Sequence, residues 1–190
     1  MKMAKIFQID FDIEAYAFCA LDDYDIVEKM EDFAINTIGT PLSFEWIAPG
    51  VEFMANDDGI TLRPDLTQWA GNDLIVSKLA AEYLAEFLTS KVVEKYPLAK
   101  EGVDYIYINP IIRLGNEVID TNKTKFSYFD DGTVDNIEVL VFKKNAMNNA
   151  PPLFTLDING GGYLYCNEDF YNKVTKNNFS GLVFTEVDQV

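Results

Sequence analysis

Short apolar runs separated by turn residues fill most of the second half of the chain, and they restrict the folds that it can adopt. Strand-like runs bounded by Asp, Asn, Gly or Pro are typical of strands joined by tight turns. Two pairs of runs flank Asp-Asp-Gly at 130–132 and Asn-Gly-Gly-Gly at 159–162, and each pair predicts a β-hairpin. The predicted strands of this half are 103–109, 111–114, 125–129, 136–142, 153–158, 163–166 and 182–187.

The first half adds further strands and the clearest helix. The predicted strands are 5–9, 15–21, 43–48, 51–54 and 74–76, and residues 62–73 read as an irregular connection. Residues 78–96 carry apolar side chains at helical spacing, with Ser77 as the N-cap and Pro97 as the stop. They predict a long helix.

Two shorter helices are expected elsewhere. Asp25 and Glu28 form a capping box, and Gly39 closes an amphipathic run that follows them. Asn167 caps a short helix in the last part of the chain. No Pro-rich or Gly/Ser-rich linker divides the 190 residues. We therefore predict one α+β domain over residues 1–190, with mainly antiparallel strands, one long helix and one or two shorter ones.

The chain has no histidine, which removes many kinds of catalytic site. A Ser-His-Asp triad, a Cys-His pair and an imidazole base are all excluded. The two thiols, Cys19 and Cys166, lie in apolar stretches and are expected to be buried and reduced. The acidic turns at 56–59 and 130–132 lack the ligand spacing of a calcium loop. The sequence predicts no metal and no cofactor.

Acidic residues outnumber basic ones by 31 to 15, so the formal net charge is −16. Such a charge is repelled by nucleic-acid phosphates and by anionic lipid, so neither is an expected partner. The first residues contain no apolar signal segment, and no apolar run reaches the ~18 residues of a membrane span. We expect a cytoplasmic protein.

The negative charge is concentrated near the start of the chain. Residues 1–60 contain 3 basic and 13 acidic residues, a net charge of −10, whereas residues 61–190 carry the remaining −6. An acidic surface attracts a basic protein. The candidate partner-binding residues are Asp10, Asp12, Asp22, Asp23, Asp25, Glu28, Glu31, Asp32, Asp57, Asp58 and Trp46.

Two other functions are compatible with the composition. A pair of carboxylates in a pocket could process a carbohydrate or another small molecule, with Trp46 or Trp69 as an aromatic platform. An exposed strand edge in the second half could bind an extended peptide. Both tryptophans are also large enough to be ordinary packing residues.

An ordered set of segments after residue 40 resembles a bacterial protein family. The segments are PLSFEW at 41–46, RPDL at 63–66, LIVS at 74–77, DYIYINPII at 104–112 with Asp120 after it, LFTL at 153–156, YLYCNE at 163–168 and FSGLVF at 179–184. The set is similar to that of the immunity proteins of polymorphic-toxin systems, a family first described as a domain of unknown function. That family often has Ser before its second helix, where this chain has Asn167.

The resemblance implies a non-enzyme that protects its cell by binding a cognate toxin domain. A toxin that attacks nucleic acid tends to be basic, because it must bind phosphates. A basic partner would suit the acidic first third of this chain. The acidic first third matches the family only loosely, so its partner residues are expected to be specific to this protein.

Overall fold

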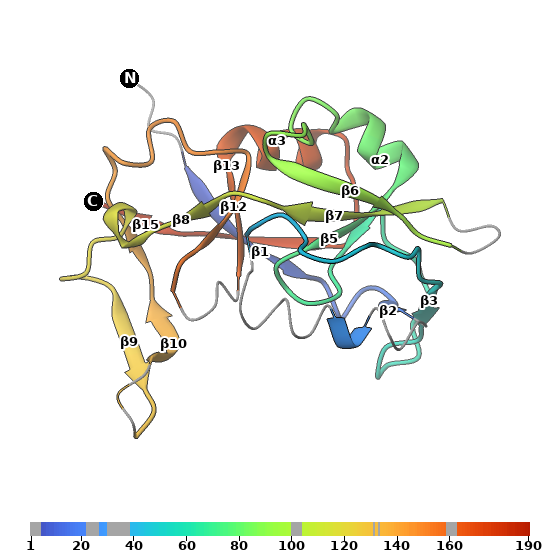
Figure 1. The fold of residues 1–190 in the computed structure, drawn as a ribbon, viewed down its shortest axis with the longest axis horizontal. Helices are drawn as coiled ribbons and strands as arrows, with labels where there is room; N and C mark the ends of the chain where they lie inside the picture. Colours follow the sequence, from blue (N-terminus) through green and yellow to red (C-terminus); the bar gives the residue numbers. More distant parts are fainter. Residues whose placement is uncertain are drawn as a thin grey trace.

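The computed structural model describes residues 5–21, 27–29, 39–99, 104–130, 132, 134–158 and 163–190. Its strands are mostly antiparallel and its helices are few, so the predicted α+β class is confirmed (Figure 1). No helix of the described part of the chain is long and apolar enough to cross a membrane.

A five-stranded sheet brings the two ends of the chain together. Its order is β14-β1-β13-β12-β8, and only the β12–β8 pairing is parallel. The strands are β1 (Ile6–Phe11), β8 (Arg113–Leu114), β12 (Leu153–Leu156), β13 (Leu164–Asn167) and β14 (Leu182–Glu186). The hairpin predicted between 153–158 and 163–166 forms β12 and β13.

A four-stranded antiparallel sheet comes from the middle of the chain, in the order β4-β5-β7-β6. Its strands are β4 (Leu66–Thr67), β5 (Leu74–Ser77), β6 (Val93–Pro97) and β7 (Tyr105–Pro110). The connection predicted as irregular, residues 62–73, thus contains the short strand β4. The strand predicted at 74–76 is confirmed as β5.

Three two-stranded sheets complete the strands. They pair β2 (Phe18–Leu21) with β3 (Val51–Met54), β9 (Lys125–Tyr128) with β10 (Val134–Val139), and β11 (Val141–Phe142) with β15 (Asp188–Gln189). A 3-10 turn, η1 (Asn116–Val118), precedes β9. The β9–β10 hairpin projects from the body of the molecule (Figure 1). It is the hairpin predicted around Asp-Asp-Gly at 130–132.

Both large sheets lead into a helix through a polar N-cap. The Ser77 Oγ accepts a hydrogen bond from the Ala80 N–H at 3.2 Å and starts α2 (Lys78–Tyr83). The Asn167 Oδ1 accepts one from the Phe170 N–H at 3.0 Å and starts α3 (Glu168–Lys176). Both predicted caps are confirmed, because a side-chain oxygen satisfies an N–H that the first helical turn leaves unpaired.

The predicted long helix over 78–96 is wrong. The α-helix stops at Tyr83, turns follow, and β6 begins at Val93. The apolar stripe is still buried, because Leu84 and Leu88 pack into the core from the turns. Val92 and Val93 are β-branched, and pairing with β7 satisfies the backbone from Val93 onward, so strand formation overrides the helical periodicity.

Two strand predictions in the first part of the chain also differ from the structure, and one helix prediction is largely untested. The predicted strand at 15–21 shortens to β2, since residues 13–15 form a turn. Residues 43–48 form no strand, because side chains rather than a ladder hold this segment, as described below. The helix predicted after Asp25 lies outside the described residues except at 27–29, which are helical.

Three hydrophobic clusters occupy the faces of the two large sheets. Alternate β1 side chains point to opposite faces: Phe7 and Ile9 join a cluster shared with both helices and both sheets, and Ile6 joins a second. The second cluster also holds Tyr165 and Phe154. A third packs β2 and β3 against β5 and β7. Cys19 and Cys166 are buried and free, as predicted.

Candidate functional site

Two loops that are far apart in the sequence lie side by side and form an acidic surface. We call residues 12–17 and 54–62 together the acidic loop pair. The buried Asn56 amide joins them: its Nδ2 donates to the Ile13 carbonyl at 2.8 Å and to the Glu14 carbonyl at 3.0 Å. Its Oδ1 accepts from the Asp58 and Ile60 N–H groups. The Ala17 N–H donates to the Leu62 carbonyl at 2.9 Å.

The acidic loop pair carries four acids, Asp12, Glu14, Asp57 and Asp58, and its two segments contain no Lys or Arg. Glu14, Asp57 and Asp58 are exposed. Asp12 is half-buried, and its Oδ1 caps the local turn by accepting from the Ala15 N–H at 3.1 Å. The structure therefore brings together three of the predicted partner-binding residues, Asp12, Asp57 and Asp58.

Three apolar side chains are exposed within the same loops. The exposed fractions are 59% for Ile13, 60% for Leu62 and 41% for Met54. A single exposed apolar residue is ordinary, but three among acids give a surface of the mixed kind that protein partners cover. The sequence reading missed these residues and Asn56. The one local signal was an isoleucine between two acids in a turn, Asp12-Ile13-Glu14.

The other predicted partner-binding residues are not all near these loops. Asp10 lies in β1, where the Gln8 amide donates to its carboxylate at 3.2 Å. Glu28 is exposed in the helical segment 27–29. Five acids of the set lie outside the described residues: Asp22, Asp23, Asp25, Glu31 and Asp32.

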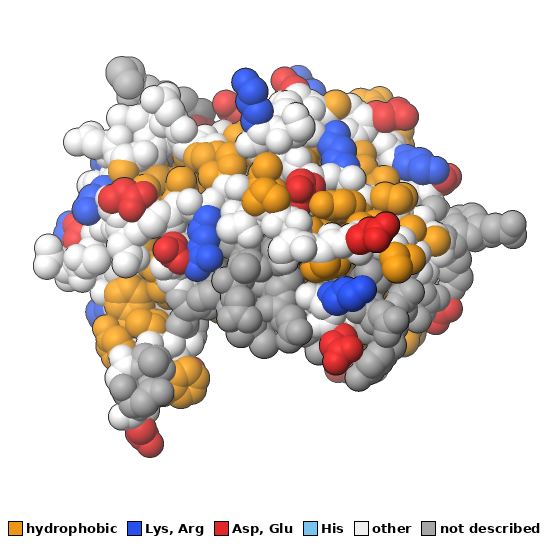
Figure 2. All heavy atoms as spheres, in the orientation of Figure 1, with side chains coloured by type: hydrophobic (Ala, Val, Ile, Leu, Met, Phe, Trp, Pro, Cys, Tyr) orange, Lys and Arg blue, Asp and Glu red, His pale blue; other side chains and the backbone are white. Residues whose placement is uncertain are grey.

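Acidic charge does not cover the whole molecule evenly. On the face shown in Figure 2, acidic side chains are interspersed with Lys and Arg among the atoms that the figure colours. Several acids are already paired with lysines: Lys5 with Glu186, Lys78 with Asp104 and Lys173 with Glu86. The acidic loop pair differs because its acids make no ion pair with a described residue.

The two tryptophans are half-buried and are used in packing. The Trp46 ring stacks on Tyr96 and Tyr107, at centroid distances of 5.0 and 4.9 Å, and its Nε1 donates to the Pro97 carbonyl at 2.8 Å. These contacts hold the segment predicted as a strand. Trp69 lies beside the third hydrophobic cluster. The predicted partner residue Trp46 thus offers little free surface.

A buried acid lies under Trp69. Asp73 is 1% exposed, and its Oδ1 accepts from the Trp69 N–H at 2.8 Å. The Ala70 N–H and the Tyr107 hydroxyl also donate to this carboxyl group. Burial raises the pKa of Asp73 to about 6, although these hydrogen bonds oppose the rise. Because the group is fully enclosed, we assign it to the structure and not to chemistry.

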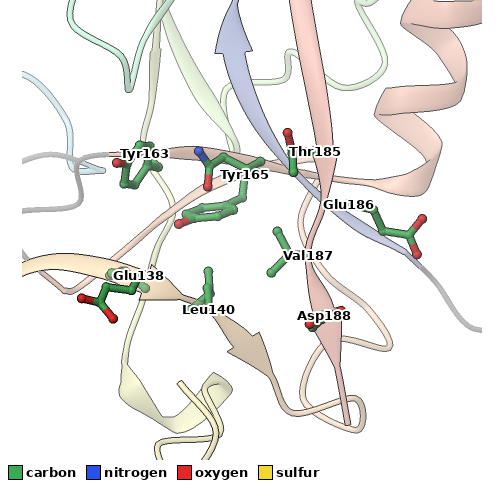
Figure 3. A pocket seen from close by; sticks show the side chains of 10 residues that line it. Glu138, Leu140, Tyr163, Tyr165, Thr185, Glu186, Val187 and Asp188 are labelled. Carbon is green, nitrogen blue, oxygen red and sulfur yellow. The ribbon is translucent and has the colours of Figure 1, made fainter. Parts of the chain in front are cut away.

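The carboxylate-pair hypothesis can be examined at one cleft, between β10 and the five-stranded sheet. Its lining includes three acids, Glu138, Glu186 and Asp188, and two tyrosines, Tyr163 and Tyr165, but neither tryptophan. In Figure 3 the carboxylates of Glu138 and Glu186 lie on opposite sides and point away from each other. Lys5 already binds Glu186 at 2.5 Å. This geometry does not present two convergent carboxylates to a substrate.

The described residues contain no group of three His, Cys, Asp or Glu side chains placed to hold a metal ion. No protein-family model matches the chain, and no curated protein sequence matches it. The resemblance to the immunity proteins of polymorphic-toxin systems therefore stays a prediction.

Proposed function

We propose that this protein is a non-catalytic immunity protein that binds a basic toxin domain in the cytoplasm and neutralises it. The observation that carries the proposal is the acidic loop pair, which carries four acids and three exposed apolar side chains. The ordered motifs after residue 40 support it independently.

The acids and the apolar side chains would make different contributions to such a complex. Unpaired surface acids attract a basic protein over about 8 Å at physiological ionic strength and so raise the association rate. Ile13, Met54 and Leu62 would lose their contact with water in the complex and so slow dissociation. The hydrogen bonds of the Asn56 amide fix both loops before binding, which lowers the entropy cost of ordering them in the complex.

The first test is protection of cells from the toxin. A gene for a secreted protein with a variable C-terminal toxin domain should lie beside the gene for this chain. Co-expression of the two should rescue growth, and purified proteins should form a complex. Absence of both rescue and complex formation would refute the proposal.

The second test asks whether the acidic loop pair is the contact surface. Replacing Ile13 and Leu62 with Ser should abolish rescue while leaving the thermal midpoint close to wild type, because both side chains are exposed. Exposed Leu79 and Tyr83 on α2 provide a matched control, since Leu79→Ser with Tyr83→Ser removes exposed apolar surface elsewhere. Equal loss of rescue in both double variants would exclude the loops as the specific contact.

A further inference from the structure

The cleft between β10 and the five-stranded sheet has the size of a side-chain pocket. Its volume is about 270 Å³, below the range of about 300 to 1,000 Å³ for drug-sized ligands and far above the ~30 Å³ share of one water molecule. Apolar groups of Ile137, Leu140 and Val187 line part of it, and Tyr163 and Tyr165 form another wall (Figure 3).

The Tyr165 side chain is almost fully buried, and its hydroxyl opens onto the cleft. Tyr165 is 2% exposed, and its hydroxyl makes no hydrogen bond with any described residue. The ring stacks on Phe154 at 5.6 Å and so is fixed in place. In Figure 3 the hydroxyl points into the space between Tyr163 and Glu138. A hydroxyl that faces a cleft can accept a hydrogen bond from a donor that enters it, so its position suits a ligand with N–H or O–H groups.

The charge around the cleft is negative. Glu138 and Asp188 are exposed and make no ion pair with a described residue, and no Lys or Arg lines the cleft. Asp10 lies close by, hydrogen-bonded to the lining residue Gln8. Burial raises the pKa of Tyr165, and the nearby Tyr163 and Asp10 raise it further, which agrees with this placement. An anion would be repelled here, whereas a cation would be attracted.

We propose that this cleft binds an arginine side chain of the basic partner protein. The three-carbon stem of arginine fits against Leu140 and Val187, and its guanidinium can donate to the Tyr165 oxygen, while Glu138 and Asp188 on the two sides of the cleft supply the negative charge. Arginine suits these acceptors better than lysine, because it has five N–H donors in a planar fork and stacks on aromatic rings. The inference deepens the proposed function, since it names a contact of the same partner.

The cleft can be tested without the partner. Isotope-labelled protein is titrated with N-acetyl-Gly-Arg-Gly-amide, and the same peptide with citrulline or lysine in place of arginine serves as a comparison. Because a single side chain makes few contacts, millimolar affinity is expected. The arginine peptide should shift resonances of Tyr163, Tyr165 and Leu140, and the citrulline peptide should not. Equal shifts with citrulline, or no shift at these residues, would overturn the proposal.

Variants separate the cleft from the overall charge of the protein. Glu138→Gln with Asp188→Asn should reduce arginine-peptide affinity at least about tenfold, and Tyr165→Phe about three- to tenfold. Glu45→Gln with Glu82→Gln makes the same change in net charge at exposed sites outside the cleft lining, and it should leave affinity unchanged. An equal loss in the control pair would show general charge attraction and would contradict a specific pocket.

The outcome of this test is distinguishable from that of the proposed function. If the cleft binds arginine peptides but no toxin is neutralised, the cleft stands and the immunity proposal fails. If free arginine binds as tightly as the peptide, the pocket serves a small molecule, and the assignment to a partner side chain is wrong. If the toxin is neutralised equally well by Glu138→Gln with Asp188→Asn, the cleft lies outside the toxin interface.

Discussion

Tyr107 and Tyr165 are buried tyrosines in inner strands of the two large sheets, yet their surroundings differ. Both are almost fully buried, at 1% and 2% exposure, and both stack on an aromatic ring. The Tyr107 hydroxyl donates to the buried Asp73 carboxyl group. The Tyr165 hydroxyl has no partner among the described residues and faces a cleft with the exposed acids Glu138 and Asp188.

The difference shows how the same residue types can serve structure in one place and binding in another. Around Asp73, each carboxylate oxygen receives protein hydrogen bonds, so the cluster is closed to ligands. Around Tyr165, the hydroxyl faces the open cleft, and no described residue makes a hydrogen bond with it. Satisfied buried polar groups fix a fold, whereas unsatisfied ones at a cleft provide affinity for what enters it.

The largest effect is expected from removing the acid of the closed cluster. Asp73→Ala leaves the Trp69 N–H and the Tyr107 hydroxyl buried without partners, so the free energy of unfolding should fall by about 3 kcal/mol or more. Urea unfolding at pH 6 measures this fall in the free energy of unfolding. Asp73→Asn keeps an oxygen for the Trp69 N–H and should cost much less. An Ala variant as stable as the Asn variant would contradict the closed cluster.

The ionisation of Asp73 provides a second test. Its folded pKa of about 6 is above the unfolded value, so the folded state binds the proton more tightly. This group should therefore lower stability as pH rises from 4 to 7, by an order-of-magnitude figure of about 3 kcal/mol. Other acids contribute to the overall pH profile, so the relevant quantity is the difference from Asp73→Asn. As pH rises over this interval, Asp73→Asn should become more stable relative to wild type. Parallel plots of the free energy of unfolding against pH would show that Asp73 does not titrate there.

The matched pair Tyr107→Phe and Tyr165→Phe tests the comparison directly. Tyr107→Phe removes a donor to Asp73 and should destabilise the protein by about 1 to 2 kcal/mol. Tyr165→Phe removes a hydroxyl that has no hydrogen-bond partner among the described residues and should change the free energy of unfolding by less than about 0.5 kcal/mol. Denaturant unfolding of the two variants measures both changes in the free energy of unfolding. Equal destabilisation would mean that the Tyr165 hydroxyl has a structural role.

The exposed acids should have the smallest effect on stability. Asp57→Asn with Asp58→Asn changes an exposed turn, so the free energy of unfolding should shift by less than about 0.5 kcal/mol. Association with the toxin domain should nevertheless slow several-fold at low salt, and the difference from wild type should vanish at high salt. Stopped-flow association rates at low and high salt measure the slowing and its disappearance. A salt-independent rate for the wild type would remove the steering role.

Local signals in the sequence were reliable where short-range chemistry decides the structure. Ser77 and Asn167 start their helices as predicted, since an N-cap acts within three residues. The pattern from 78 to 96 misled because the same apolar side chains can be buried from a helix or from turns. The alternation of Val93, Glu94, Lys95 and Tyr96 indicated a strand, but only pairing with β7 made it one.

The candidate site shows the same contrast between short-range signals and long-range contacts. The sequence placed Asp12, Asp57 and Asp58 in acidic turns, and it showed an excess of negative charge in the first third. It could not show that the Asn56 amide bonds to carbonyls 42 and 43 residues earlier in the chain. Nor could it show that Trp46 stacks on two tyrosines, or that Asp10 lies close to Tyr165.

The sequence by itself determined the α+β class, the helix starts, two hairpins and the acidic character of the surface. These depend on residue type and on neighbours a few positions away. Tertiary structure decided which strands share a sheet, which acids are buried as Asp73 is, and which polar groups are left for a ligand as Tyr165 is. Burial and hydrogen-bond satisfaction depend on residues brought together from distant parts of the chain, and short-range patterns carry no record of that pairing.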